Sequence, residues 1–365
     1  MTSSLNAQRG MTLIELMVAL LLGLLLTAAA VQLLVTGQIT YNLQKSSAEV
    51  QDNGLFGMEV LNRSMRLANY NNRTALINDE IPWGGVVLSS DVDDDPAKGD
   101  LPRNLEAVTT NGTAKNYIPA ALLSRGNGMT AGTGNQWTGA SNVVLSSGTS
   151  VASDQLVVQY TAPEDMYDCE GNRALGPRTA SITENGTTVS RRIPGDTVVE
   201  RYFLRQDNVK NASEPNAPLA LACDASRYHL NDQARVIANT VIMGNPSDGG
   251  TAIPYGDAGQ VIMNRVDQFH VLLGVQPPQA GDNRMLFYTL DNYMKLTAPR
   301  PRVVALKVAV LARSSSNSRN KQVDNRQVFE LLGQQVKVKP ASNDYYVRQV
   351  YTSTVALRNA MGDRS

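Results

Sequence analysis

The most pronounced pattern along the chain is a long apolar run close to its start. Residues 16–35 contain no charged side chain and are almost continuously apolar. At about 1.5 Å per residue, a helix of this length crosses the roughly 30 Å hydrocarbon layer of a membrane. The run does not end in a secretory cleavage site, because it continues as TGQITYNLQKSS, which is compatible with the same helix. We therefore expect the apolar segment to stay in the mature protein as an anchor.

Beyond this anchor, apolar and small residues recur at steps of three or four, which is typical of one face of an amphipathic helix. These positions are Leu43, Ser47, Val50, Gly54, Met58, Leu61, Met65 and Ala68. The pattern predicts one helix from residue 11 to about residue 70, roughly 90 Å long. Residues 11–36 would lie in the membrane, and residues 37–70 would pack on a soluble head.

From residue 71 the pattern changes to short runs of β-branched and aliphatic residues, which predict strands. Runs such as LKVAVLARS and QVYTSTVAL alternate apolar and polar residues, as expected for antiparallel strands with one solvated face. Two tracts, 89–99 and 122–141, predict exposed loops. The predicted strands are 86–88, 143–145, 156–160, 198–204, 236–243, 271–275, 285–290, 303–311 and 346–357. The expected fold class is α+β, with a mainly antiparallel β head at residues 71–365.

Composition excludes several functional classes. The 33 basic and 33 acidic residues balance, so the chain lacks the net positive field that attracts nucleic acid. Histidines number only two, and neither a Gly-x-Ser-x-Gly turn nor a Walker loop occurs. We expect no enzymatic activity, no cofactor and no nucleic-acid partner.

Two charged tracts are candidates for ligand binding. Asp91, Asp93 and Asp95 alternate like the first ligands of an EF-hand loop, but Pro96 replaces the required Gly and Pro102 the bidentate Glu. We expect a solvated acidic loop, with the three aspartates as the only metal candidates. A basic group could contact phosphates, but its strand-like setting predicts the solvated face of a sheet. Its members are Arg300, Arg302, Lys307, Arg313, Arg319, Lys321 and Arg326.

A carboxylate interrupts the anchor near its start. Glu15 lies in the apolar segment, where a central charge costs about 3 kcal/mol, and the first basic residue after the polar leader is Lys45. A cut between Gly10 and Met11 would create an amino group one helical turn away. This amine could pair with Glu15 in the same subunit or in a neighbour. The alternative is a carboxylate that reaches the membrane interface without a partner.

These residues resemble the prepilin leader and N-methylation motif, in which Gly10 precedes a hydrophobic Met11 and the sequence Thr-Leu-Ile-Glu ends at Glu15. The resemblance implies a type IV pilin-like fold with a leader at residues 1–10. It also implies cleavage after Gly10 by a membrane aspartyl prepilin peptidase and methylation of the Met11 amine. Many members carry Phe at the first mature position, so Met11 is a departure from the common pattern.

Segments of the head resemble the PilW family of minor pilins. They are SDQLVVQYTAPEDMYDCEG, VVERYFLR, LALAC, VIMNRVDQFHVLLGV, RPRVVALKVAVLARS and TSTVALRN. The resemblance implies a type IV pilus subunit that helps to prime assembly or to form the tip. Implied partners are other minor pilins, the major pilin, the prepilin peptidase, the inner-membrane assembly platform and a PilY-type tip adhesin. The N-terminus would be cytoplasmic and the head periplasmic until assembly moves the subunit into a surface pilus.

Two other functions stay open. A J-like pseudopilin of type II secretion shares the anchor, although its head is usually smaller. A ligand-binding module at the pilus tip, for calcium, DNA or a surface, has support only from the aspartate tract and the basic group.

Both cysteines, Cys169 and Cys223, follow the predicted membrane crossing, where an oxidising compartment permits a disulfide. Closing a loop of about 55 residues stabilises a domain by about 4 kcal/mol in the chain-entropy model. The alternative is a pair of buried thiols. We predict the disulfide.

Overall fold

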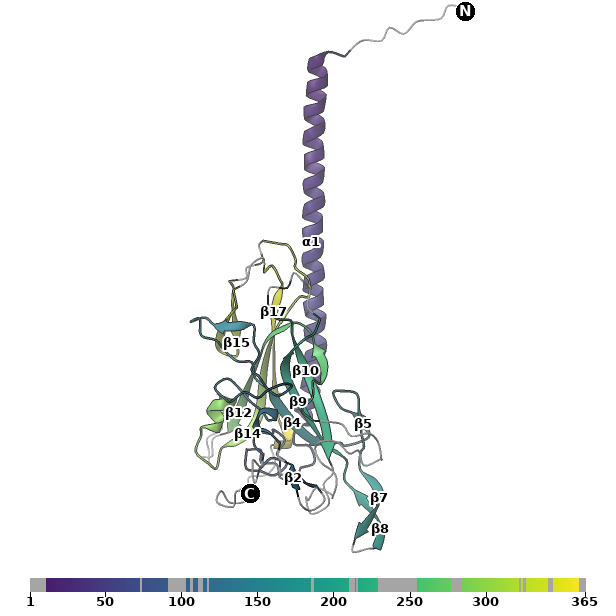
Figure 1. The fold of residues 1–365 in the computed structure, drawn as a ribbon, viewed down its shortest axis with the longest axis vertical. Helices are drawn as coiled ribbons and strands as arrows, with labels where there is room; N and C mark the ends of the chain where they lie inside the picture. The colour runs from purple at the N-terminus through teal and green to yellow at the C-terminus, as the bar shows by residue number, and fades with distance from the viewer. Residues whose placement is uncertain are drawn as a thin grey trace, which may run out of the picture.

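The computed structural model describes residues 11–360 except 73, 91–102, 106–107, 111–113, 117, 185–186, 210–213, 215, 229–254, 277–283, 322, 324–325 and 341–343. One long helix, α1 (Leu13–Leu67), projects from a β-rich head (Figure 1). The helix begins after Thr12, whose hydroxyl accepts a hydrogen bond from the Glu15 N–H at 3.3 Å, and its C-cap is Ala68. The predicted long N-terminal helix and the α+β fold class are confirmed.

Two four-stranded antiparallel sheets form the centre of the head. The first sheet has the order β11 (Gln260–Met263), β10 (Leu219–Tyr228), β9 (Thr197–Gln206) and β4 (Leu156–Thr161). The second sheet has the order β13 (Leu286–Thr289), β12 (Val266–Gln276), β14 (Arg302–Arg313) and β17 (Arg348–Ala356). Neighbours in both sheets pair antiparallel, as the sequence predicts.

Smaller elements surround these sheets. A three-stranded sheet has the order β15 (Val328–Leu331), β16 (Gln334–Val338) and β3 (Val143–Leu145). Three hairpins are β1 (Val108–Thr110) with β2 (Ala114–Asn116), β5 (Met166–Tyr167) with β6 (Arg173–Ala174), and β7 (Arg178–Glu184) with β8 (Thr187–Ile193). The short helices are α2 (Leu290–Met294), η2 (Ala120–Leu122) and η3 (Arg358–Ala360).

Most predicted strands are present. β3, β4, β9, β12, β14 and β17 coincide with predicted runs, whereas the run at 236–243 lies outside the described residues. The run at 86–88 forms only an isolated bridge from Val86 to Val158. The run at 285–290 ends early, because Leu290 begins α2. The sequence analysis missed β10, β11, β15, β16 and the three hairpins.

The expected solvated strand face is wrong for the first sheet and for β14. Every residue of β10 and nearly every residue of β9 and β14 is buried. Over the first sheet, Val157 and Val199 pack in one apolar cluster with Trp83 and Tyr255 from loops and with Leu122 from η2. Loop segments therefore cover a face that alternation alone assigns to solvent.

The tract 122–141 is only partly an exposed loop. Residues 122–126 are buried, and so is Trp137, whose indole N–H donates to the Ser153 carbonyl at 2.8 Å. The Gly, Ser and Asn content of the tract correctly indicates turns. It does not reveal that part of the tract is buried.

The main core lies between the lower half of α1 and the two large sheets. Val50, Met58, Leu61 and Met65 of the helix share one cluster with residues of both sheets. The predicted helix face is confirmed except at Ser47, which is exposed while Ser46 is buried.

Candidate functional site

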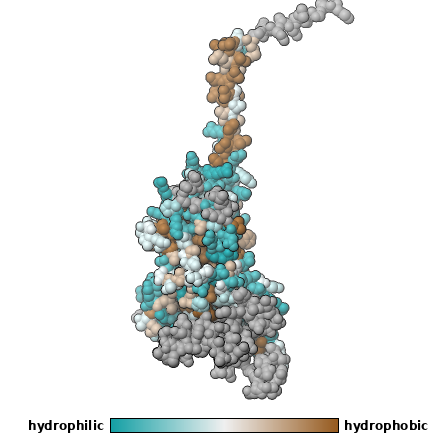
Figure 2. Space-filling view, in the orientation of Figure 1, coloured by the Kyte–Doolittle hydropathy of each residue, from teal (hydrophilic) through white to brown (hydrophobic). Residues whose placement is uncertain are grey.

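The upper half of α1 packs against none of the described residues of the head. Its apolar side chains from Leu13 to Val35 are exposed, and they form the brown column above the head (Figure 2). Within the described part of the chain, α1 is the helix whose length and composition suit a membrane span. Leaving a large aliphatic side chain in water forgoes about 1.5–3 kcal/mol. This half of the helix therefore requires lipid or other apolar helices around it.

The start of α1 carries two of the predicted processing residues. Met11 is exposed, and Glu15 is exposed in the first turn, where the helix dipole favours a negative charge. No ion pair of Glu15 forms within the described residues. Gly10 lies outside them, so the roles of Gly10, Met11 and Glu15 stay predictions.

The lower half of α1 fits into the head through two glycines. A Cβ atom at Gly54 would lie 2.2 Å from Cζ of the Tyr351 ring, and one at Gly57 would lie 2.5 Å from Cε of Met263. No side chain fits at these positions without displacement of the ring or the thioether. The glycines thus let the helix backbone approach β17 and β11 closely.

Polar contacts fix the register of α1 on the head. The Asn53 amide donates to the Asn264 carbonyl at 2.6 Å and its oxygen accepts from the Asn264 N–H at 3.0 Å. Ser353 donates its hydroxyl hydrogen to the Asn62 side-chain oxygen at 2.6 Å, and Tyr351 donates to the Val50 carbonyl at 3.0 Å. Such specific contacts make the helix and the head one structural unit.

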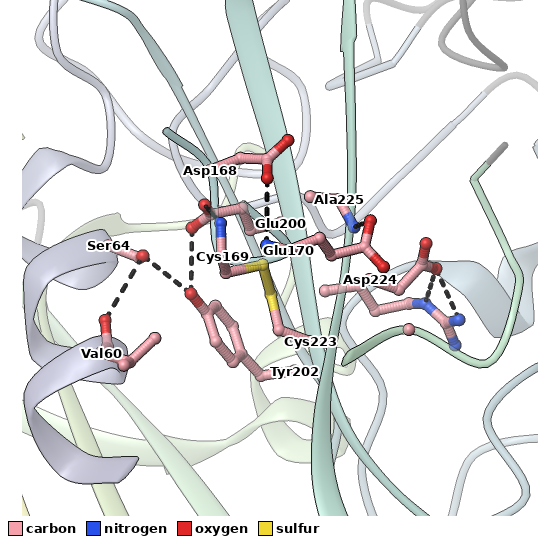
Figure 3. Close-up of a disulfide and its surroundings, with 12 residues drawn as sticks. Val60, Ser64, Asp168, Cys169, Glu170, Glu200, Tyr202, Cys223, Asp224 and Ala225 are labelled. Carbon is pink, nitrogen blue, oxygen red and sulfur yellow. Dashed lines mark hydrogen bonds and ion pairs between the residues drawn. A yellow bond between two sulfur atoms is a disulfide. The ribbon is translucent and has the colours of Figure 1, made fainter. Parts of the chain in front are cut away.

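The buried carboxyl group of Glu200 lies beside helix α1 (Figure 3). Glu200 of β9 accepts hydrogen bonds from the Tyr160 hydroxyl at 3.0 Å, the Cys169 N–H at 2.9 Å and the Tyr202 hydroxyl at 3.0 Å. The Tyr202 hydroxyl also lies 2.7 Å from Oγ of Ser64 on α1. All these partners are neutral. Burial raises the pKa of Glu200, because the charged form loses its hydration.

The disulfide lies directly beside this carboxyl group. Cys169 and Cys223 are bonded, with Cα atoms 6.2 Å apart, as the sequence predicts. The bond joins the turn between β5 and β6 to the centre of β10. Because the Cys169 N–H also donates to Glu200, the bond, the buried carboxyl and α1 form one connected region.

The predicted solvated basic face is wrong for Arg313 and Arg300, whereas Arg319, Lys321 and Arg326 are exposed as expected. Arg313 is buried and lies 3.4 Å from Glu214 and 3.3 Å from Asp267. Arg300 pairs with Asp79. These acidic partners are distant in sequence, so the local pattern could not reveal them. Asp91, Asp93 and Asp95 lie outside the described residues.

The two histidines of the chain are His229 and His270. His270 is buried and its Nδ1 lies 2.8 Å from the Asp154 carboxyl, which agrees with a satisfied core residue. His229 lies outside the described residues. The sequence analysis missed Glu200, whose only signal is an acidic residue in the apolar run VVERYFLR.

Comparisons with known proteins agree with the architecture. Residues 228–359 match the family described as Type IV Pilus-assembly protein W, and residues 5–31 match the Prokaryotic N-terminal methylation motif. These matches support a minor pilin of the type IV pilus. Pilins are structural subunits rather than enzymes, and the motif and the apolar helix fit a pilin anchored in the inner membrane.

Comparison with curated proteins gives no match for this chain. Among solved structures, the Type IV-like pilin TTHA1219 from Thermus thermophilus is 14% identical. That match covers 60% of this chain and 84% of the other chain, with a TM-score of 0.25.

Proposed function

We propose that this minor pilin is cut after Gly10, methylated on the Met11 amine and drawn into the pilus through α1. One observation carries the proposal: α1 is divided into a half that is packed on the head and a half whose apolar side chains are exposed in the described part of the chain. A subunit built in this way can leave lipid for a bundle of like helices without unfolding its head. Glu15 then pairs with the new amine of Met11, in its own subunit or in a neighbour.

The outer face of the docked half offers a second contact surface for pilus components. Leu55 and Phe56 are exposed there, and Tyr41 is exposed nearer the N-terminus of α1. Large apolar side chains grouped on one helix face favour contact with another apolar surface. These residues support association with neighbouring pilin helices.

We place the N-terminus in the cytoplasm and the head in the periplasm before assembly. The disulfide supports this orientation, because the periplasm is oxidising. In this scheme the partners are the prepilin peptidase, the inner-membrane assembly platform, the major pilin and other minor pilins. The PilW match supports a priming or tip role beside a PilY-type adhesin.

Two experiments in the producing cell separate this function from the alternatives. Deletion of the gene should abolish twitching and surface pili, and the intact gene should restore both. Loss of exoprotein release with normal piliation would instead assign the chain to the type II secretion pseudopilus. Normal pili with defective surface attachment would favour a tip ligand-binding module and contradict a priming role.

A further inference from the structure

Three carboxyl groups converge beside the disulfide. Glu170 lies in the turn between β5 and β6, Asp224 lies in β10, and Asp257 precedes β11. One oxygen from each lies within 4.8 Å of the others. Figure 3 shows the carboxyl groups of Glu170 and Asp224 side by side. The convergence is built by three segments that are far apart in the sequence.

The disulfide and local hydrogen bonds hold this arrangement. Glu170 directly follows Cys169 and Asp224 directly follows Cys223, so the covalent bond between the cysteines brings both carboxyl groups together. The Ala225 N–H donates to Oε2 of Glu170 at 3.1 Å. Asp257 accepts from the Gly259 N–H at 2.7 Å. The three side chains are thus positioned before any ligand arrives.

The buried Asp224 carboxyl has an oxygen without a partner. Its Oδ2 accepts from the Arg201 guanidinium, in an ion pair of 2.6 Å, and from the Gly256 N–H at 2.9 Å. Its Oδ1 has no hydrogen-bond partner in the described part of the chain, although Asp224 is fully buried. In Figure 3 the ion-pair lines reach only one oxygen of the Asp224 carboxyl group. A buried oxygen without a partner is destabilising, so its position calls for a ligand.

The charge balance around the cluster is negative. Three carboxyl groups face one guanidinium, that of Arg201. Burial raises the pKa of Glu170 to about 7, and Asp168 adds to the negative potential there. A divalent cation would neutralise the excess.

We propose that Glu170, Asp224 and Asp257 bind a divalent cation, with calcium as the best fit. Carboxylate oxygens are the ligands that hard cations prefer, and Ca²⁺ accepts irregular sets of six to eight oxygens at about 2.3–2.6 Å. Glu170 and Asp257 are only partly buried, so water can complete the shell. The cation would tie the segment before β11 to the disulfide region. The residues of this site are not those of the Asp91, Asp93 and Asp95 tract considered in the sequence.

Calorimetry on the purified mature chain in detergent micelles tests the proposal, with CaCl₂ as the titrant after removal of metal by a chelator. We expect one Ca²⁺ per chain and a rise in melting temperature. Glu170→Gln and Asp257→Asn should each weaken binding at least tenfold. Glu164→Gln, an exposed change in the same region, should bind as the wild type does. Asp224→Asn is avoided because it would also break the buried Arg201 pair.

Several results would overturn the proposal. Absence of Ca²⁺ binding by the folded wild-type chain would remove the site. Equal binding by the wild type and by both Glu170→Gln and Asp257→Asn would show that the cation binds elsewhere. Tighter binding of Mg²⁺ than of Ca²⁺ would contradict the calcium assignment. The test needs no pilus, so its outcome is independent of the proposed role in assembly.

Discussion

Glu15 and Glu200 are two carboxyl groups in opposite surroundings. Glu15 is exposed at the start of α1 and forms no ion pair in the described residues, whereas Glu200 is buried among neutral donors in the head. The first is available to a partner subunit, and the second belongs to the interior of its own. Substitutions at the two positions should therefore give different phenotypes.

Glu15→Ala should leave membrane insertion and cleavage intact but reduce incorporation into pili, because it removes the carboxylate that pairs with the Met11 amine. Insertion itself should become slightly easier. The measurement is the amount of the subunit in sheared pili relative to the membrane fraction. Glu59→Ala removes an exposed carboxylate from the docked half of α1 and serves as the control. Wild-type abundance of the Glu15→Ala protein in pili would contradict the pairing.

Glu200→Gln should stabilise the head at neutral pH, because a carboxyl group whose pKa is raised on folding lowers the unfolding free energy once the pH exceeds its unfolded-state pKa. The pKa of Glu200 is raised in the folded state. Its contribution to stability is therefore fully present below the unfolded-state pKa and is lost as the pH rises. Gln stays neutral, and its amide can donate to the Tyr202 hydroxyl, which then donates to Ser64.

Denaturant unfolding of wild type and Glu200→Gln at pH 4.5, 6 and 8 checks this expectation. The difference in unfolding free energy should grow with pH. Glu164→Gln should show no such growth, because Glu164 is exposed. Parallel pH profiles for wild type and Glu200→Gln would show that Glu200 is charged in the folded head.

Helix α1 shows which structural features a local pattern can reveal. Its length and apolar face follow from hydrophobicity and spacing, and both were predicted. The same residues do not show why Gly54 and Gly57 are small, because Tyr351 and Met263 lie some 200 to 300 positions away. The partners of Arg313 were hidden for the same reason. Local periodicity encodes elements, whereas these contacts are made only when the elements pack.

Gly54→Ala should destabilise the joint between α1 and the head by about 1–3 kcal/mol, because the new methyl group overlaps the Tyr351 ring. Higher helix propensity offsets at most about 1 kcal/mol of this loss. Gly37→Ala is the matched control, since nothing lies within 4 Å of its Cβ position. Thermal unfolding should therefore show a lower melting temperature for Gly54→Ala only. Equal melting temperatures for the two variants would mean that the helix does not approach β17 closely.

The whole molecule has two structural parts, a packed head and an exposed helix half. The described β sheets, the docked half of α1 and the disulfide form one body, and the exposed half of α1 extends from it (Figure 1). Alternation predicted the strands, but it could not predict that loop segments bury the outer face of the first sheet. Covering that face makes the head more compact than a simple two-sided sheet.

Removal of the disulfide should destabilise the whole head. The paired variant Cys169→Ser with Cys223→Ser should lose about 4 kcal/mol in the chain-entropy model, and the protein should be degraded or poorly assembled. Cleavage after Gly10 should continue, because the leader is remote from the head. Thiol labelling of the denatured, unreduced wild type should find no reactive thiol. Two labelled thiols per chain would contradict the bond.

The central claim is that this chain enters the pilus as a processed subunit held by α1. Mass spectrometry of its N-terminal peptide from sheared surface pili tests that claim most directly. We predict a peptide that begins at Met11 and carries one methyl group on its amine. Gly10→Val should instead leave uncut precursor in the membrane. Pilus-associated protein that retains Met1, or pili that lack the chain altogether, would contradict the account.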